Sequence, residues 1–209
     1  MSRSIENIVF DLGGVLVDWN PEYLYRKVFG EQKEQMDWFL SNVCTPQWNM
    51  EQDAGRTLHK GTALLIGQFP EYEKYIRMFY DRWEEMIAGE ISEVVSLLES
   101  LKARNRERLF ALTNWSAETF VLAQRRFDFL NHFEGIVVSG QEGTRKPFGK
   151  IYEILLERYA LDPLRSVFID DNYENIRAAE RFGIHGIHFR DTEQLKRDLT
   201  ALGILKHSL

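Results

Sequence analysis

The chain has 209 residues, of which 44% are hydrophobic and 28% charged, and its formal net charge is −6. These values are typical of a globular protein with one sizeable core and a small subdomain, and the negative charge argues against a nucleic-acid surface. One cysteine, Cys44, excludes an internal disulfide, and without an apolar signal segment or a run of roughly 18 apolar residues we expect a cytoplasmic protein with no membrane partner.

The first predicted element is a strand at Ile5–Phe10, which ends directly in Asp11, Leu12 and two glycines. An apolar run with this ending is typical of a buried parallel strand that delivers a carboxylate to the edge of a sheet where ligands bind. The glycines permit a sharp turn or a close approach of a ligand to the backbone. Asp11 is therefore a candidate metal ligand, nucleophile or both, and the alternative is an ordinary turn after a strand.

The next segment, residues 21–88, is rich in aromatic side chains with helical spacing, and no strand of a parallel sheet fits there. We interpret residues 18–88 as a helical cap over the strand ends, with hinges near residues 18–20 and 88–90. Residues 1–17 and 89–209 then form the core domain. A cap in this place excludes water from a site and selects its substrate.

Most aromatic side chains of the cap are expected to form its own core. The candidate substrate contacts are polar residues in its middle, Trp48-Asn49 and Asp53-Ala54-Gly55-Arg56. Arg56 is a candidate for holding a second anionic group of a substrate, and the alternative is an ordinary surface arginine.

After the cap, apolar strand patterns alternate with amphipathic helical patterns. The expected strands are Leu109–Leu112, Gly135–Ser139, Ser166–Ile169 and His185–Phe189. The expected helices are Ile91–Arg104, Ser116–Phe127, Phe148–Tyr159, Tyr173–Phe182 and Thr192–Leu202. This alternation predicts an α/β fold with a doubly wound, mainly parallel sheet and the helical cap inserted after its first strand.

Polar residues follow three of these later strands. Thr113-Asn114 follows the strand Leu109–Leu112. The strand Gly135–Ser139 leads through a loop to Lys146, and the next residue, Pro147, suits the first turn of a helix. Lys146 would then lie where a helix N-terminus already favours anions. A further strand ends in the acid pair Asp170-Asp171.

Two adjacent carboxylates repel each other unless a cation or a proton compensates them. Together with Asp11, the pair Asp170-Asp171 forms an all-oxygen set suited to a hard cation, and Mg²⁺ is the usual choice beside a phosphate. The alternative is that Asp171 or Asn172 caps the following helix while Asp170 lies in solvent.

The order of Asp11, Thr113, Lys146-Pro147 and Asp170-Asp171 resembles the haloacid dehalogenase-like (HAD) superfamily of hydrolases, mostly Mg²⁺-dependent phosphatases. Each motif is short and weak by itself, but together they cover essentially the whole chain. The segment Phe10–Leu16 is similar to the first motif of bacterial sugar-phosphate phosphatases, Asp-Leu-Gly-x-Val. The resemblance implies a Rossmann-like core with a cap, and a small phosphate ester as substrate.

The resemblance also implies a mechanism. Asp11 would attack phosphorus in line and form an aspartyl-phosphate that water hydrolyses. Mg²⁺ would be bound by Asp11, Asp171 and the backbone carbonyl of Gly13, with Asp170 bound directly or through water.

By the same resemblance, the substrate phosphate would contact Thr113, through its hydroxyl, and Asn114, through its backbone N–H. Lys146 would neutralise the crowded negative charge and orient the nucleophile. Asn175, one helical turn after the acid pair, would support it without touching the metal, and Arg56 remains the candidate contact from the cap.

One position departs from the family pattern. Many members carry a general acid two residues after the nucleophile, where this chain has Gly13. General acid catalysis is typically worth ~10²–10⁴-fold. Another carboxyl could substitute, with Asp18, Asp53 and Glu142 as candidates. Otherwise turnover is slow, or the substrate has a good leaving group, such as an acyl or aryl phosphate.

Two alternatives of other classes remain open. A 2-haloacid dehalogenase would share the nucleophile and the lysine without a metal, but the pair Asp170-Asp171 argues against it. A catalytically weak protein that binds a phosphorylated metabolite is compatible with Gly13. The sequence leaves open which phosphate ester is the substrate and what the oligomeric state is.

Overall fold

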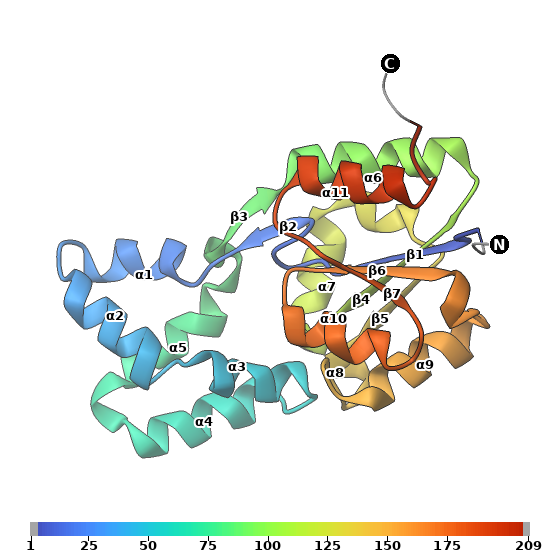
Figure 1. The fold of residues 1–209 in the computed structure, drawn as a ribbon. Helices are drawn as coiled ribbons and strands as arrows, with labels where there is room; N and C mark the ends of the chain where they lie inside the picture. Colours follow the sequence, from blue (N-terminus) through green and yellow to red (C-terminus); the bar gives the residue numbers. More distant parts are fainter. Residues whose placement is uncertain (1–3, 207–209) are drawn as a thin grey trace.

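The computed structural model describes residues 4–206 of the chain. Its main sheet has five strands in the order β5-β4-β1-β6-β7, and all neighbouring strands run parallel (Figure 1). The strands are β1 (Asn7–Phe10), β4 (Arg108–Thr113), β5 (Gly135–Val138), β6 (Ser166–Asp170) and β7 (His185–His188). The predicted doubly wound parallel sheet is thus confirmed, and the central strand is β1.

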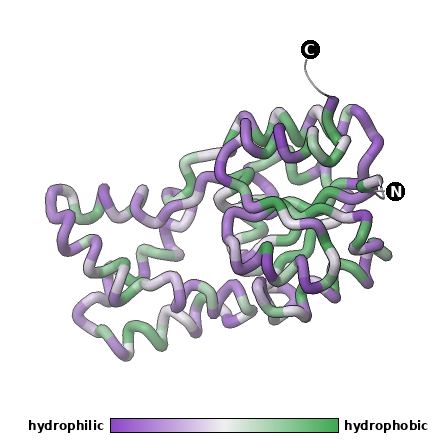
Figure 2. Tube along the Cα trace, in the orientation of Figure 1, coloured by the Kyte–Doolittle hydropathy of each residue, from purple (hydrophilic) through white to green (hydrophobic). Residues whose placement is uncertain are grey.

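Helices cover both faces of this sheet (Figure 1). The helices of this part are α6 (Ser92–Arg104), α7 (Ala117–Arg126), α8 (Ser139–Glu142), α9 (Gly149–Tyr159), α10 (Tyr173–Glu180) and α11 (Thr192–Ala201). Ile8 of β1 packs in the cluster that includes α6 and α11, whereas its neighbour Val9 packs in the cluster that includes α9 and α10. The inner strands β1, β4 and β6 are buried on both faces and are therefore largely continuous apolar runs, as Figure 2 shows.

A helical unit is inserted between β1 and α6 and lies to the left of the sheet in Figure 1. It consists of α1 (Glu22–Phe29), α2 (Lys33–Asn42), α3 (Pro46–Asp53), α4 (Leu58–Gln68) and α5 (Glu73–Asp81). Aromatic rings pack inside it, with ring centroids 5.0 Å apart for Tyr25 and Phe39 and for Phe29 and Tyr75. Within residues 4–206, no helix combines the length and apolarity needed to cross a membrane.

An antiparallel two-stranded ribbon connects the helical unit to the core. It pairs β2 (Val17–Trp19) with β3 (Ile87–Glu90), and Val17 lies opposite Glu90. The sequence pattern predicts hinges at these positions but no strands. The pairing joins segments far apart in sequence, and three or four residues are too few to show a strand pattern of their own.

Candidate active site

Three acidic side chains meet at the carboxyl end of the sheet. Asp11 follows β1 directly, Asp170 is the last residue of β6, and Asp171 comes next. Because β6 pairs with β1 in parallel, these strand ends lie side by side. Each residue offers a carboxylate oxygen, and the three oxygens lie within 4.8 Å of one another. The structure therefore brings together the acids that the sequence analysis singled out.

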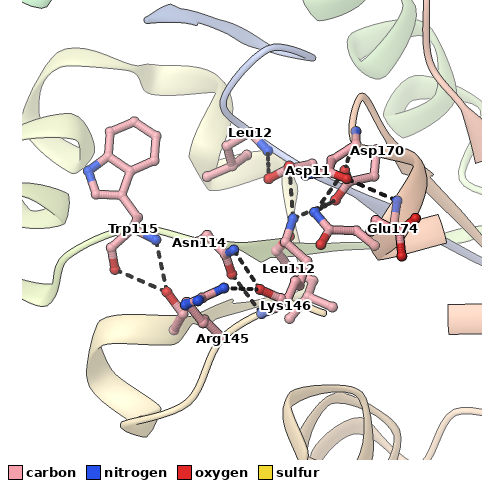
Figure 3. Close-up of polar contacts among 12 residues, drawn as sticks. Asp11, Leu12, Leu112, Asn114, Trp115, Arg145, Lys146, Asp170 and Glu174 are labelled. Carbon is pink, nitrogen blue, oxygen red and sulfur yellow. Dashed lines mark hydrogen bonds and ion pairs between the residues drawn. The ribbon is translucent and has the colours of Figure 1, made fainter. Parts of the chain in front are cut away.

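The ammonium group of Lys146 lies between two of these carboxylates (Figure 3). Its Nζ is 2.8 Å from Oδ2 of Asp11, 2.6 Å from Oδ2 of Asp170 and 2.9 Å from the carbonyl oxygen of Leu112. These three acceptors match the three N–H donors of the ammonium. Burial by itself lowers the pKa of Lys146, but the two carboxylates outweigh it and raise the pKa. Lys146 is a fixed positive charge of the site.

The neighbouring acids Asp170 and Asp171 have different surroundings. Asp170 is completely buried, and its Oδ1 accepts hydrogen bonds from the backbone N–H of Asn172 (2.7 Å) and from Asn175 (3.0 Å). Asp171 is exposed and lines an open cleft. The alternative in which Asp170 lies in solvent is therefore wrong, although Asn172 does cap α10.

Gly14 makes room for the carboxylate of Asp171. A Cβ at Gly14 would lie 2.2 Å from Oδ2 of Asp171, and the φ of Gly14 is +73°. Both the close approach and the left-handed backbone require glycine here. At Gly13, by contrast, a Cβ would meet nothing within 4 Å.

The charges of this cluster fit a divalent cation. Three carboxylates and one ammonium leave two negative charges uncompensated. Burial raises the pKa of Asp11 well above its ordinary value, against the lowering effect of Lys146. Burial, and then the charge of Asp170, also raise the pKa of Asp171. A cation bound between these oxygens would remove this cost, and an all-oxygen donor set suits Mg²⁺.

The end of β4 contributes two further predicted residues. Thr113 is completely buried, and its hydroxyl has no hydrogen-bond partner within the part of the chain that the structure describes. Asn114 exchanges two hydrogen bonds with the backbone of Lys146, donating to its carbonyl (3.0 Å) and accepting from its N–H (2.8 Å). The Asn114 side chain therefore fixes the loop that carries the lysine.

Lys146 is positioned by a turn rather than by the first turn of a helix. The sequence pattern places Pro147 at the start of the helix expected at Phe148–Tyr159, but α9 begins at Gly149. The backbone N–H of Phe148 donates to the carbonyl of Arg145 (2.9 Å), which closes a turn ahead of the helix. The Lys146–Pro147 peptide bond in this turn is cis.

A cleft of about 620 Å³ opens in front of Asp11 and Asp171, between the sheet edge and helix α3. A smaller cavity of about 80 Å³ adjoins it. Five residues line both spaces, namely Gly13, Trp19, Asn49, Asp53 and Asn114. Asn49 and Asp53, which the sequence analysis proposed as cap contacts, thus face the acids of the core.

The smaller cavity is lined by four aromatic side chains, Trp19, Tyr80, Trp83 and Trp115. No sequence pattern pointed to Trp19 or Trp115, and the aromatic residues of the helical unit were expected mainly in its own core. Trp115 follows directly after Thr113-Asn114, so its place after a site strand was a signal that could have been used. Trp19 lies on the ribbon, which the sequence did not reveal.

Arg56 lies outside the group that surrounds the cleft. Its Nε donates to Oε1 of Gln52 (2.6 Å) and its Nη2 to the carbonyl of Trp48 (3.1 Å). Gln52 in turn donates to the hydroxyl of Tyr80, which donates to Asn49. The geometry therefore does not support the expected contact of Arg56 with a substrate, because its guanidinium forms hydrogen bonds inside the helical unit.

Asp53 is at the far end of this hydrogen-bond network, where its Oδ2 accepts from Asn49 (3.2 Å). Burial raises the pKa of Asp53 to about 7, against the lowering effects of Arg145 and of a hydrogen bond from the Ser116 backbone. With this pKa, the Asp53 carboxyl is about half protonated at neutral pH.

The two other candidate acids are placed differently. Asp18 accepts hydrogen bonds from the hydroxyl of Tyr23 at 2.9 and 3.0 Å. Glu142 forms a double hydrogen bond with Arg158, at 2.8 Å for each contact. Neither residue lines the cleft or the adjoining cavity.

Comparison with known proteins gives a consistent picture. A family model described as haloacid dehalogenase-like hydrolase matches residues 5–183. A sesquiterpene phosphatase from Aspergillus oryzae is 26% identical over 92% of this chain and 93% of its own. A phosphorylated carbohydrates phosphatase from Thermotoga maritima is 24% identical over 88% of this chain and 84% of its own.

Some relatives are much longer than this chain. Acyl-CoA dehydrogenase family member 10 from Mus musculus is 24% identical over 96% of this chain, but the match covers only 19% of that protein. Among solved structures, a predicted HAD-like family hydrolase from Porphyromonas gingivalis superposes with a TM-score of 0.75 and 25% identity. The superposition covers 98% of this chain and 100% of that one.

Proposed function

We propose that this chain, which belongs to the haloacid dehalogenase-like hydrolases, is a Mg²⁺-dependent phosphatase that acts on a small phosphate ester through Asp11. The observation that carries the proposal is the cluster of three carboxylates, two of them ion-paired to Lys146, which borders the cleft. The helical unit, residues 18–88, serves as the cap that encloses the substrate.

Asp11 is the nucleophile in this proposal. Its Oδ1 accepts from the backbone N–H of Leu12 (2.7 Å) and its Oδ2 from Lys146, so the carboxylate is fixed before substrate enters. A fixed carboxylate loses little orientational freedom when it attacks phosphorus. The bond from Asp11 to phosphorus forms as the ester bond breaks, and water then hydrolyses the aspartyl-phosphate.

Asp11, Asp171 and the backbone of Gly13 would hold Mg²⁺, with Asp170 in contact directly or through water. When bound, the ion offsets the repulsion between the nucleophile and the phosphate oxygens. Asp170 also fixes Lys146 and is fixed by Asn175, so its main task in this arrangement is positioning.

The phosphate group would be bound at the ends of β4 and β1. The unpartnered hydroxyl of Thr113 and the backbone N–H of Asn114 supply donors, and Lys146 supplies the positive charge. Two relatives suggest substrate classes to compare, isoprenoid phosphates and sugar phosphates.

The test is release of orthophosphate from a panel of sugar, isoprenoid, nucleoside and aryl phosphates, with Mg²⁺ and with EDTA. We expect hydrolysis that needs Mg²⁺ and that falls more than ~10³-fold in Asp11→Asn, because this change removes the nucleophile. Full activity of Asp11→Asn would refute the proposal.

The same preparations distinguish the two alternatives. Release of chloride from 2-chloropropionate in EDTA would show a dehalogenase. Binding of phosphate esters without any turnover would show a binding protein. The pair Asp170-Asp171 favours the phosphatase, because a halide-releasing reaction has no use for a cation site.

A further inference from the structure

The reaction proposed above requires a proton for the departing oxygen. An alkoxide is a poor leaving group, and its protonation in the transition state is typically worth ~10²–10⁴-fold. The residue two positions after Asp11 is Gly13, which has no side chain to supply the proton. Another group that faces the cleft must do so, or alkyl esters will react slowly.

Carboxyl groups around the cleft differ in their availability. Within the described residues, Asp11, Glu22, Asp53 and Asp171 are the acids that line it. Asp11 and Asp171 belong to the carboxylate cluster, and Glu22 forms an ion pair with Arg26 at 2.5 Å. Asp53 also lines the adjoining aromatic cavity. It is therefore the acid that borders both spaces and stands apart from the cation site.

Asp53 is held against the core at a defined place. It ends helix α3, and Gly55 just beyond it abuts α8, where a Cβ on Gly55 would lie 3.2 Å from the Cα of Gly143. The backbone of Ser116, shortly after the phosphate-binding end of β4, also forms a hydrogen bond with Asp53. The cap thus delivers this carboxyl to the core side of the cleft.

The surroundings of Asp53 favour its protonated form. Three indole rings and Tyr80 line the cavity beside it, and burial raises its pKa to about 7. The charged and titratable groups that face it are Arg145, from the loop before Lys146, and Tyr80 on α5. Arg145 lowers the pKa without outweighing burial. A carboxyl that is about half protonated at neutral pH can both donate and accept a proton.

We propose that Asp53 is the general acid and base of the reaction, a proposal that rests on the phosphatase function above. As Asp11 bonds to phosphorus, the electron pair of the ester bond moves to the leaving oxygen, which takes the proton of Asp53. The carboxylate of Asp53 then accepts a proton from the water that attacks the aspartyl-phosphate, and Asp11 leaves as a carboxylate. Both protons are accounted for, and Asp53 ends the cycle protonated.

The decisive experiment compares Asp53→Asn with the wild type on two ester classes in saturating Mg²⁺. An alkyl phosphate needs its leaving oxygen protonated, whereas 4-nitrophenolate leaves without a proton. We expect kcat/KM for the alkyl ester to fall roughly 10²–10³-fold and that for 4-nitrophenyl phosphate to fall less than about 10-fold. Equal losses on both esters would overturn the role.

Asp18→Asn is the matched control, since it makes the same change in an acid that does not line the cleft and retains an oxygen for Tyr23. It should leave both rates unchanged. The double variant Gly13→Asp with Asp53→Asn places an acid where a Cβ meets no atom, and it should regain alkyl ester hydrolysis. Failure of an active, folded double variant to regain it would count against proton donation.

A pH profile tests the same role without any substitution. For the wild type, kcat/KM on the alkyl ester should fall above about pH 7 as Asp53 loses its proton, and the profile on 4-nitrophenyl phosphate should lack this limb. Identical profiles on both esters would overturn the role of Asp53. The phosphatase function itself would fail by a different result, full activity of Asp11→Asn.

Discussion

The cleft lies between a core wall, formed by the ends of β1, β4 and β6, and a cap wall, formed by the helical unit. The two walls hold their aspartates in different ways. On the core wall, Asp11 and Asp170 share the buried ammonium of Lys146 at 2.8 and 2.6 Å. On the cap wall, Asp53 receives a hydrogen bond from the neutral amide of Asn49 and lies beside aromatic side chains. The same residue type is therefore ion-paired to a buried lysine on the core wall and hydrogen-bonded to a neutral amide on the cap wall.

This difference shows that partners decide the chemistry of a buried carboxyl. A full opposite charge in contact stabilises the carboxylate, whereas burial without one stabilises the acid. A phosphoryl transfer needs both forms, an anion to attack and an acid to protonate.

Removal of the shared ammonium should have the largest effect on stability. Lys146→Met leaves two buried carboxylates without their cation, and we expect the free energy of unfolding to fall by about 3–5 kcal/mol. Urea denaturation at neutral pH measures this. Lys150→Met removes an exposed lysine paired with Glu153 and should change it by less than about 0.5 kcal/mol. Comparable losses in both variants would mean that the core wall does not depend on Lys146.

The adjacent acids should respond differently to the same substitution. Asp170→Asn weakens the contacts to Lys146 and Asn175, so we expect a loss of about 2–3 kcal/mol in stability. Asp171→Asn should change stability little in EDTA but remove the rise in Tm that we expect excess Mg²⁺ to give the wild type. Thermal unfolding in both buffers measures these effects. An unchanged Mg²⁺ response in Asp171→Asn would remove Asp171 from the cation site.

The two glycines that follow Asp11-Leu12 form another matched pair. Gly14→Ala places a Cβ 2.2 Å from Asp171 and requires alanine at φ +73°, so we expect a loss of about 1–3 kcal/mol and weaker Mg²⁺ binding. Gly13→Ala meets no atom within 4 Å and should cost less than about 1 kcal/mol. Calorimetric titration with Mg²⁺ and urea denaturation separate the two. Equal Mg²⁺ affinities would show that Asp171 tolerates displacement.

The smallest effect concerns the cap wall and depends on pH. The pKa of Asp53 rises from an ordinary 3.8 to about 7 on folding, so the folded protein binds more protons between these values. This group therefore lowers the free energy of unfolding as pH rises from about 4 to about 7. Asp53→Asn removes this pH-dependent loss of stability, so we expect the variant to be more stable than the wild type at about pH 8. Because Asp53 is only partly buried, solvent screening limits the expected gain to about 1 kcal/mol.

The gain of Asp53→Asn should shrink toward zero near the ordinary pKa of the carboxyl. Chemical denaturation at both pH values gives the comparison. A variant that is destabilised equally at both would show that Asp53 is an ordinary ionised contact and would erase the contrast between the walls.

The sequence predicted the core wall well because its signals are local. The buried strands β1, β4 and β6 each end abruptly in a polar group, and parallel strands bring such ends to one edge of the sheet. Asp11, Thr113 and Asp170-Asp171 could therefore be placed before any coordinates, and Lys146 followed from the loop between two elements. The helices between the strands were predicted from their 3.6-residue spacing.

The cap wall was harder to predict because its contacts join distant segments. Arg56 is three residues after Asp53, yet its partners are Gln52 and the backbone of Trp48, so its charge is used within the cap. The aromatic cavity draws on the ribbon, α5, η2 (Trp83–Met86) and the end of β4. No local pattern specifies such a meeting, and the high pKa of Asp53 depends on it.

The ribbon of β2 and β3 has a consequence for how this architecture can change. The chain enters and leaves the helical unit at paired positions, Asp18 opposite Gly89, and the five-stranded sheet takes no strand from the inserted segment. A different helical segment can therefore be spliced between the same two strands without altering the order of the sheet. Since Asp53 belongs to that segment, an exchange would replace the proposed proton donor together with the helical wall of the cleft, while Asp11 and the three-carboxylate cluster would stay in place.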